Sequence, residues 1–340
     1  MSKLFNVVIV GPSTMVGEAV LALLEEREFP VGQIYTAAED AGGRVAFKNG
    51  NLKVEQVEGF DFSLADIAFF CVDEDASEEY VPRATAAGCI VVDDSPCFRL
   101  EDDVPLVVPE VNHERLGGYT QRHIVSNPST CALMLATVLK PLADVVGITH
   151  VNAVTMQAAS GRDQAGVEEL ARQATAMFNL QTIESKVFPA QIAFNLIPQI
   201  GGFLDDGSSR EEVKLLWETQ KLLNNNELKI DVTAVRVPVF HGHSMVLHIE
   251  LNEALGAESA RNILANTDGI KVIDELEDGE YPTPVSDVIG HDAVFVGRIR
   301  NGASGGTSLN LWVVADNVRM GAGLNSVKVA ECLVKEYIKQ

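Results

Sequence analysis

The segment Phe5-Asn6-Val7-Val8-Ile9-Val10-Gly11-Pro12-Ser13-Thr14-Met15-Val16-Gly17 decides the fold of the amino-terminal part of the chain. Phe5 to Val10 is a continuous apolar run, as in strands covered on both faces, and Met15 to Glu28 has the apolar spacing of a helix. A glycine turn between a first strand and a first helix is where dinucleotide-binding proteins rest a pyrophosphate on the helix N-terminus. Gapped glycines such as Gly11 and Gly17 also occur at ordinary turns, so both interpretations stay open.

The pattern of strands and helices changes once along the chain. Through residue 150, short β-branched runs (33–36, 67–72, 89–93) alternate with helical patterns, which is typical of βαβ units and a parallel sheet. After His150, long helices are interleaved with alternating strands at 232–239, 245–251 and 309–315. The sequence therefore predicts an α/β domain followed by an antiparallel α+β domain.

Composition excludes several classes of protein. A length of 340 residues suggests about two domains, and a formal net charge of −22 opposes binding to nucleic acid or an anionic membrane. The chain holds no apolar run long enough to cross a bilayer, and Met1-Ser2-Lys3-Leu4-Phe5 leads straight into a strand, so we expect a cytoplasmic protein. Its five cysteines are widely spread without zinc-ligand spacing, so we expect free thiols and no metal.

A second motif is the segment Ser126-Asn127-Pro128-Ser129-Thr130-Cys131, which opens an apolar helical run that ends at Leu139-Lys140-Pro141. A reactive cysteine is best held at a helix N-terminus, where unpaired N–H groups and the dipole lower the thiol pKa. The segment resembles the Asn-Pro-Asn-Cys-Ser-Thr motif of aspartate-semialdehyde dehydrogenases. Counting back from Leu139 without gaps puts Thr130 at the nucleophile position and Cys131 one step, about 100°, further on.

The resemblance implies a domain organisation. It indicates a Rossmann-type NAD(P)-binding domain over 1–130, completed by a C-terminal helix over 318–340. The substrate-binding and dimerisation domain would span 131–317 as an α+β unit with a mixed or antiparallel sheet. A homodimer is implied by the same resemblance.

The cofactor loop departs from the family pattern. The family reads Gly-Ala-Thr-Gly-Ala-Val-Gly, and here its middle glycine is Thr14, whose side chain should crowd a phosphate. The Arg-Ser pair that holds the 2′-phosphate of NADP is replaced by Glu39-Asp40, which favours NAD over NADP if either binds. Acidic residues 73–75 follow the next strand, and Ser160-Gly161-Arg162-Asp163 stands for Ser-Gly-Ala-Gly. The resemblance implies these cofactor-binding residues: Gly11, Ser13, Thr14, Met15, Val16, Glu39, Ser160, Gly161 and Asn317.

The substrate side matches the family more closely. In the family, a cysteine attacks an acyl phosphate, a histidine moves the proton, hydride reduces the acyl-enzyme, and arginines hold the carboxylate and phosphate. By resemblance, Gln157 orients the intermediate and His243, with a pKa suited to proton transfer near neutrality, is the general acid/base. The implied substrate-binding residues are Arg99, Asn127, Glu211, Lys214 and Arg236.

Three functional hypotheses remain open. The first is a homologue with little or no dehydrogenase activity that binds a small amino-acid-derived ligand, as in the USG-1-like paralogues, because Thr130 is a weak nucleophile. The second is a working NAD(P)-dependent oxidoreductase that uses Cys131. The third is a purely structural dimer partner. Under the first hypothesis, we expect Thr130 to point toward His243 and Cys131 to turn into the domain core.

Overall fold

The computed structural model describes residues 3–275 and 277–338. The chain forms two compact units. The first consists of Met1–Ser129 with Ala322–Gln340, and the second of Thr130–Gly321. Each unit has its own sheet and is described separately below.

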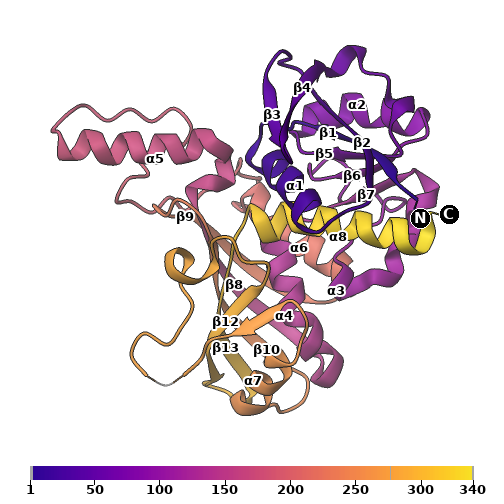
Figure 1. The fold of residues 1–340 in the computed structure, drawn as a ribbon. Coiled ribbons are helices and arrows are strands. Elements are labelled where there is room, and N and C mark those ends of the chain that lie inside the picture. The colour runs from indigo at the N-terminus through magenta and orange to yellow at the C-terminus, as the bar shows by residue number, and fades with distance from the viewer. Residues whose placement is uncertain (1–2, 276, 339–340) are drawn as a thin grey trace. The chain divides into compact units, whose positions relative to one another are not determined.

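The sheet of the first unit has the order β3-β4-β2-β1-β5-β6-β7 (Figure 1). Its strands are β1 (Phe5–Val10), β2 (Val31–Ala38), β3 (Arg44–Phe47), β4 (Gly50–Gln56), β5 (Ile67–Phe70), β6 (Ile90–Asp93) and β7 (Ile124–Ser126). Every pair is parallel except the β3–β4 hairpin. The loops that follow β1, β2, β5 and β6 therefore leave the sheet at one edge, where open α/β sheets bind ligands.

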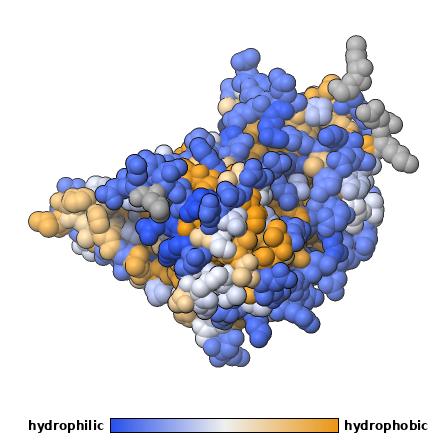
Figure 2. Space-filling view, turned by 90° about the horizontal axis from the view of Figure 1, so that it is seen from below, coloured by the Kyte–Doolittle hydropathy of each residue, from blue (hydrophilic) through white to orange (hydrophobic). Residues whose placement is uncertain are grey.

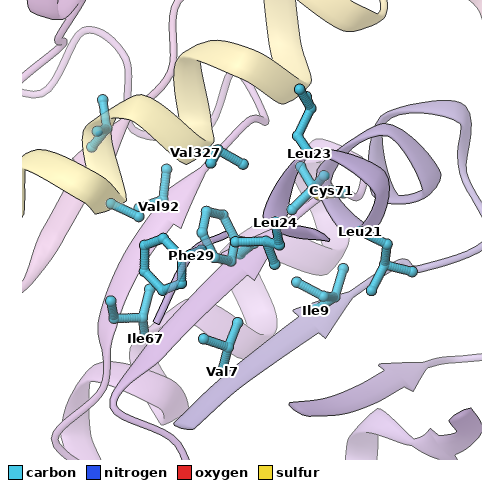
Figure 3. Close-up of a cluster of buried hydrophobic side chains, with 14 of the residues drawn as sticks. Val7, Ile9, Leu21, Leu23, Leu24, Phe29, Ile67, Cys71, Val92 and Val327 are labelled. Carbon is cyan, nitrogen blue, oxygen red and sulfur yellow. The ribbon is translucent and has the colours of Figure 1, made fainter. Parts of the chain in front are cut away.

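Helices cover this sheet and fill its core. They are α1 (Met15–Glu26), α2 (Glu74–Ala86), α3 (Pro109–Asn112) and α8 (Asn325–Cys332), with 3-10 helices at Val57–Gly59, Phe62–Leu64 and His113–Gln121 and a π-helix at Leu333–Tyr337. Figure 3 shows Val327 of α8 over the same buried cluster as Leu23 of α1 and Val92 of β6. The C-terminal helix thus packs within the first unit.

The sheet of the second unit is mixed and has the order β11-β12-β13-β10-β8-β9. Its strands are β8 (Ile148–Gln157), β9 (Lys229–Arg236), β10 (His243–Leu251), β11 (Ile270–Val272), β12 (Val294–Gly302) and β13 (Gly305–Ala315). The β8–β9 and β11–β12 pairs are parallel, and the others are antiparallel. The fold class is confirmed, with the mixed form of the second sheet.

The helices of this unit are α4 (Thr130–Val146), α5 (Asp163–Phe178), α6 (Arg210–Leu223) and α7 (Ala257–Ala265), with shorter turns at Ala159–Arg162, Pro284–Val288 and Arg319–Leu324. Ten residues of α4 are buried. Apolar side chains gather near the outer end of α5, where Phe178 is 79% and Leu180 is 95% exposed (Figure 2, left).

Several predicted boundaries shift in the structure. The strand Phe5–Val10 is confirmed, the first helix ends at Glu26, and β9 ends at Arg236, three residues earlier than the predicted 239. The β3–β4 hairpin was not predicted, because its polar residues carry no strong apolar alternation. Across the described residues, no helix combines the length and apolar character that a bilayer crossing requires.

Candidate active site

Sheet register gathers three of the predicted residues at one edge of the second unit. Gln157 at the end of β8 lies opposite Arg236 at the end of the parallel strand β9. The antiparallel strand β10 begins at His243, and its Ser244 pairs with Met156 of β8. Strand ends therefore position an amide, a guanidinium and an imidazole side by side, although the three residues lie far apart in the sequence.

Gly161 brings Arg236 and His243 into one contact. A side chain at this position would collide with Nη1 of Arg236, and its Cβ would lie 3.3 Å from Nε2 of His243. Only glycine fits between the two side chains without displacing them. The reason for glycine at position 161 is therefore the close approach of Arg236 and His243, and not an unusual backbone conformation.

Arg236 is buried and held by the backbone. It is 4% exposed, and its Nη1 donates to the Ala158 carbonyl oxygen over 2.7 Å. Burial lowers the pKa of this guanidinium to about 10, while the neighbouring Glu211 raises it. The group stays charged at neutral pH, so it can bind a carboxylate in a site that excludes water.

His243 is neutral, contrary to our expectation of a pKa near neutrality. Burial and the charge of Arg236 lower its pKa to about 3, against a smaller opposing effect of Glu211. The Ala158 N–H donates to its Nδ1 over 3.3 Å. A neutral imidazole that accepts at Nδ1 carries its proton on Nε2, so His243 presents a hydrogen-bond donor toward Gly161. Taking up a second proton would cost this histidine its backbone hydrogen bond.

Glu211 and Lys214 lie near the start of α6, and Glu211 connects this helix to the sheet. Glu211 Oε1 accepts from Gln157 Nε2 over 3.0 Å, and its Oε2 lies 2.6 Å from Lys214 Nζ. A capping box between Ser209 and Glu212 fixes the start of this helix. The pair is more than a surface ion pair, because the side chain of Glu211 is only 12% exposed and contacts the predicted orienting amide.

Thr130 begins α4, where we expected its side chain to point toward His243, but its hydroxyl bonds to another residue. Its Oγ1 donates to the Asn317 carbonyl oxygen over 3.0 Å, and its side chain packs against Gly321, where any Cβ would collide with it. The Thr130–Asn317 bond forms because the chain after β13 passes the first turn of α4 and brings the Asn317 carbonyl oxygen to the Thr130 hydroxyl.

Cys131 is buried, as expected, at 2% exposure. Glu211, Lys214 and Arg236 are among the charges that act on its thiol. Burial is the main cause that raises its thiol pKa well above 9.0, followed by Glu211. A thiol in this state is a poor nucleophile, since the thiolate is the reactive form.

Asn317 connects several backbone segments of the site. Its Oδ1 accepts from Ser160 Oγ and from the Gly242 N–H, each over 3.0 Å, and its carbonyl oxygen accepts from Thr130. Both Ser160 and Asn317 are nearly fully buried. These predicted cofactor-binding residues hold the loops around His243 together, and this contact accounts for them without a bound nucleotide.

Arg99 and Asn127 belong to the first unit and meet there at Asp94. Arg99 Nη2 donates to the Asp94 carbonyl oxygen, and Asn127 Nδ2 donates to Asp94 Oδ1 over 2.6 Å. Asn325 donates to Asn127 Oδ1 and holds it in place. Sequence reasoning missed Asp94 and Asn325. The position of Asp94 directly after the buried strand β6 was the available signal.

The glycines of the predicted cofactor loop are required by the protein's own packing. A Cβ at Gly11, whose φ is +81°, would collide with the Cys71 carbonyl oxygen, and one at Gly17 would collide with the Gly11 carbonyl oxygen. Thr14 caps α1, since its Oγ1 accepts from the Gly17 N–H over 3.0 Å and donates to the Gly11 carbonyl oxygen over 2.9 Å. The Gly17 N–H at the helix N-terminus is therefore already bonded to the Thr14 side chain and is not available to a phosphate. Ser13, Met15 and Val16 lie on the same turn.

The acidic residues at this edge of the sheet have separate structural accounts. Asp73 caps α2, because its Oδ1 accepts from the Ala76 N–H over 3.0 Å. Glu74 and Asp75 lie in the first turn of this helix, where negative charges interact favourably with the helix dipole. Glu39 and Asp40 are exposed directly after β2. Two carboxylates there disfavour a 2′-phosphate, whereas Glu39 suits a ribose hydroxyl.

Asp163 adopts a backbone conformation that is essentially restricted to glycine. Its φ is 55° and its ψ is −161° where the loop Ala159–Arg162 meets α5. The neighbouring Arg162 lowers the pKa of Arg236, which places a second positive charge near the site. Sequence reasoning noted both residues only as departures and did not identify the strain or this charge.

These features define a class of protein: a two-domain chain whose first unit has a dinucleotide-binding topology and whose second unit carries a largely buried cluster of an arginine, a histidine, a glutamine and a glutamate. Two family models match it. "Semialdehyde dehydrogenase, NAD binding domain" covers residues 6–119, and "Semialdehyde dehydrogenase, dimerisation domain" covers residues 139–320.

Full-length relatives narrow the class. The chain is 44% identical to the aspartate-semialdehyde dehydrogenase of Legionella pneumophila over 340 residues, which is 99% of this chain and 98% of that protein. It is 42% identical to that of Shewanella violacea over 339 residues, which is 99% and 100% of the two chains. The crystal structure of aspartate semialdehyde dehydrogenase II complexed with ASA from Vibrio cholerae superposes with a TM-score of 0.96 at 43% identity, over 99% of this chain and all of that one. The chain belongs to the aspartate-semialdehyde dehydrogenase family.

Proposed function

We propose that this protein binds a small amino-acid-derived ligand, of the type of aspartate β-semialdehyde, and has little or no dehydrogenase activity. It would be a USG-1-like paralogue within the family. One observation carries the proposal. The head of α4 holds Thr130, whose hydroxyl is bonded to Asn317, and the thiol of Cys131 beside it is buried with a raised pKa. Neither group is an activated nucleophile.

The proposed ligand follows from the charged groups of the site. Arg236 would bind the ligand carboxylate, and Glu211 would accept from its amino group. Lys214 would neutralise a second anionic group, and the Nε2–H of His243 would donate to a carbonyl oxygen. An amino acid with a side-chain carbonyl supplies the carboxylate, the amino group and the carbonyl oxygen, and a separate anion such as inorganic phosphate would be the partner of Lys214.

Neutral His243 supports binding rather than catalysis. Removal of a proton from a thiol needs an acceptor nitrogen, and the Nδ1 of His243 already accepts from Ala158. Its other nitrogen carries the proton. The site is therefore suited to polarising a carbonyl more than to generating a thiolate.

The same proposal covers the cofactor, the assembly and the location. Thr14, Glu39 and Asp40 suit NAD better than NADP, and we infer that either binds weakly. The exposed Phe178, Leu180 and Phe194 support a homodimer through the second unit. We further infer a cytoplasmic location, which fits a family of biosynthetic enzymes.

Calorimetric titration with aspartate β-semialdehyde tests the ligand. We expect saturable binding by the protein as it stands, and a loss of at least about tenfold in affinity for Arg236→Lys, because one lost charge-assisted hydrogen bond costs about 1.5–3 kcal/mol. The exposed Arg300→Lys is the matched control and should bind normally. Equal binding by both variants would remove Arg236 from the ligand site.

A second candidate function is a working dehydrogenase that uses Cys131. It is favoured by the charges around that thiol, since Lys214 and Arg236 lower its pKa against the larger effect of burial. A ligand that neutralised Glu211 would shift this balance further toward the thiolate. Phosphate-dependent reduction of NADP that disappears in Cys131→Ser would favour this function over the first.

A further inference from the structure

Three side chains of different chemistry meet in the first unit, in a place that the proposed function does not use. His113, Cys332 and Glu336 each offer one ligand atom, and these atoms all lie within 4.8 Å of one another. The closest pair is His113 Nε2 and Glu336 Oε2, which are 2.8 Å apart. No spacing in the sequence announces this group, because His113 and Glu336 are separated by 223 positions.

The fold brings the three residues together through the C-terminal helix. Cys332 is the last residue of α8, and Glu336 lies one turn later in Leu333–Tyr337, so both face the same side. His113 caps α3 and begins His113–Gln121, and the ring of Tyr337 lies 6.5 Å from its imidazole, centroid to centroid. Packing of α8 against α3 thus brings His113 close to Cys332 and Glu336.

The donor set is one that zinc prefers. An imidazole nitrogen, a thiolate and a carboxylate oxygen bind Zn²⁺ at about 2.0–2.1, 2.3 and 2.0–2.2 Å, respectively, in tetrahedral sites that a fourth ligand or water completes. Tetrahedral angles at these lengths separate the ligand atoms by about 3.3–3.6 Å. Atoms that lie up to 4.8 Å apart would have to approach by up to about 1.5 Å. His113 Nε2 and Glu336 Oε2, now 2.8 Å apart, would have to separate by about 0.5 Å or more, which side-chain rotation of the exposed Glu336 can supply.

We propose that His113, Cys332 and Glu336 form a zinc-binding site that ties the C-terminal helix to the segment after α3. Binding of the metal would replace the hydrogen bond between His113 and Glu336 by bonds from both residues to the ion. The Cys332 thiol would lose its proton to solvent when it becomes a ligand. The inference is independent of the proposed function, because none of these residues belongs to the candidate active site.

Electrostatics around Cys332 favour a cation. Burial and the negative charges of Glu336, Glu331 and Glu110 raise the pKa of this thiol, and Lys335 opposes them. A divalent ion at this place would meet several carboxylates, which compensate its charge. Arg27 and Lys328 already pair with Glu331 and Glu110, respectively, so these two carboxylates stay close without occupying the site.

The alternative is an ordinary surface ion pair. His113 and Glu336 have side chains that are 37% and 40% exposed, and a pair of that kind contributes little to stability. The two interpretations differ in the part played by Cys332. An ion pair does not need the thiol, whereas zinc ligation does.

Titration of the full chain with ZnCl₂ after treatment with a chelator separates the two. We expect one zinc per chain, and a loss of affinity of more than about 100-fold in Cys332→Ser and in His113→Gln, since even residues outside the coordination shell change metal affinity by about 10- to 100-fold. Cys97→Ser, at the other partly buried cysteine, is the control and should bind normally. Circular dichroism establishes that each variant is folded.

Cobalt provides a second measurement. Co²⁺ should give thiolate-to-metal charge-transfer absorption in the native protein and in Cys97→Ser, and none in Cys332→Ser. The proposal is overturned if zinc does not bind stoichiometrically, if folded Cys332→Ser binds it as tightly as the native chain, or if the cobalt complex shows no thiolate absorption.

Discussion

The Thr130 hydroxyl donates a hydrogen bond to the Asn317 carbonyl oxygen over 3.0 Å. Asn317 also accepts from Ser160 and from the Gly242 N–H through its side chain. The residue at the head of α4 is therefore part of the framework that positions the loop before His243. This hydrogen bond gives Thr130 a structural role in the site.

Labelling of thiols in the native protein should modify Cys131 more slowly than the partly buried Cys97 and Cys332. Burial raises its pKa well above 9.0, whereas Cys97 and Cys332 are only partly buried. Mass spectrometry of the protein after brief treatment with iodoacetamide at neutral pH measures the order. Rapid modification of Cys131 that a substrate analogue blocks would reverse it.

Acid should destabilise the folded protein through His243. The pKa of this histidine falls from 6.5 to about 3 on folding, chiefly through burial, with Arg236 lowering and Glu211 raising it. Between these values the unfolded chain binds more protons, so stability is complete above about pH 6.5 and is lost as the pH falls toward 3, with a slope of up to about 1.4 kcal/mol per pH unit.

A difference measurement isolates this effect. Asp93 has its pKa raised to about 6 by burial, so its contribution is present below about pH 4 and is lost as the pH rises through 6. The free energy of unfolding is measured by denaturant for the native protein and for His243→Gln across pH 4 to 7. Both proteins contain Asp93, so its contribution cancels in the difference between them. The native protein should lose its advantage over the variant as the pH falls, and a constant difference would contradict a neutral buried histidine.

Strain at Asp163 should be released by glycine. The backbone there has φ 55° and ψ −161°, which costs a residue with a Cβ about 1–3 kcal/mol. In denaturant unfolding, we expect the free energy of unfolding of Asp163→Gly to exceed that of Asp163→Ala by about 1 kcal/mol or more. Both variants lack the carboxylate, so the comparison isolates the backbone, and equal stabilities would show that the conformation is relaxed.

Nucleotide binding should show no preference for NADP. Glu39 and Asp40 are exposed at the end of β2, where a 2′-phosphate needs cations. Titration at two ionic strengths should give affinities for NADP that do not exceed those for NAD, and Asp40→Arg should shift the ratio toward NADP. A preference above about tenfold for NADP in the native chain would contradict the assigned role of the loop.

Sequence patterns predicted the architecture because apolar periodicity reports burial directly. The run Phe5–Val10 became β1 with the predicted bounds, and the change of pattern after His150 corresponds to the second sheet. Motif matches singled out Gln157, Arg236 and His243 as individual residues, and sheet register accounts for their convergence.

The remainder depended on tertiary contacts that leave no local signal. Burial decides the pKa of His243, and no pattern around that residue reveals how much water it excludes. The orientation of Thr130 depends on where the Asn317 carbonyl lies, 187 positions away. The approach of His113 to Glu336 likewise depends on how α8 packs.

The most direct test of the central claim is the rate at which purified protein reduces NAD or NADP with aspartate β-semialdehyde and inorganic phosphate. The account predicts a rate absent or several orders of magnitude below that of an active family member assayed in parallel, and unchanged by Cys131→Ser, because neither Thr130 nor Cys131 is an activated nucleophile. Robust phosphate-dependent turnover that Cys131→Ser abolishes would contradict it.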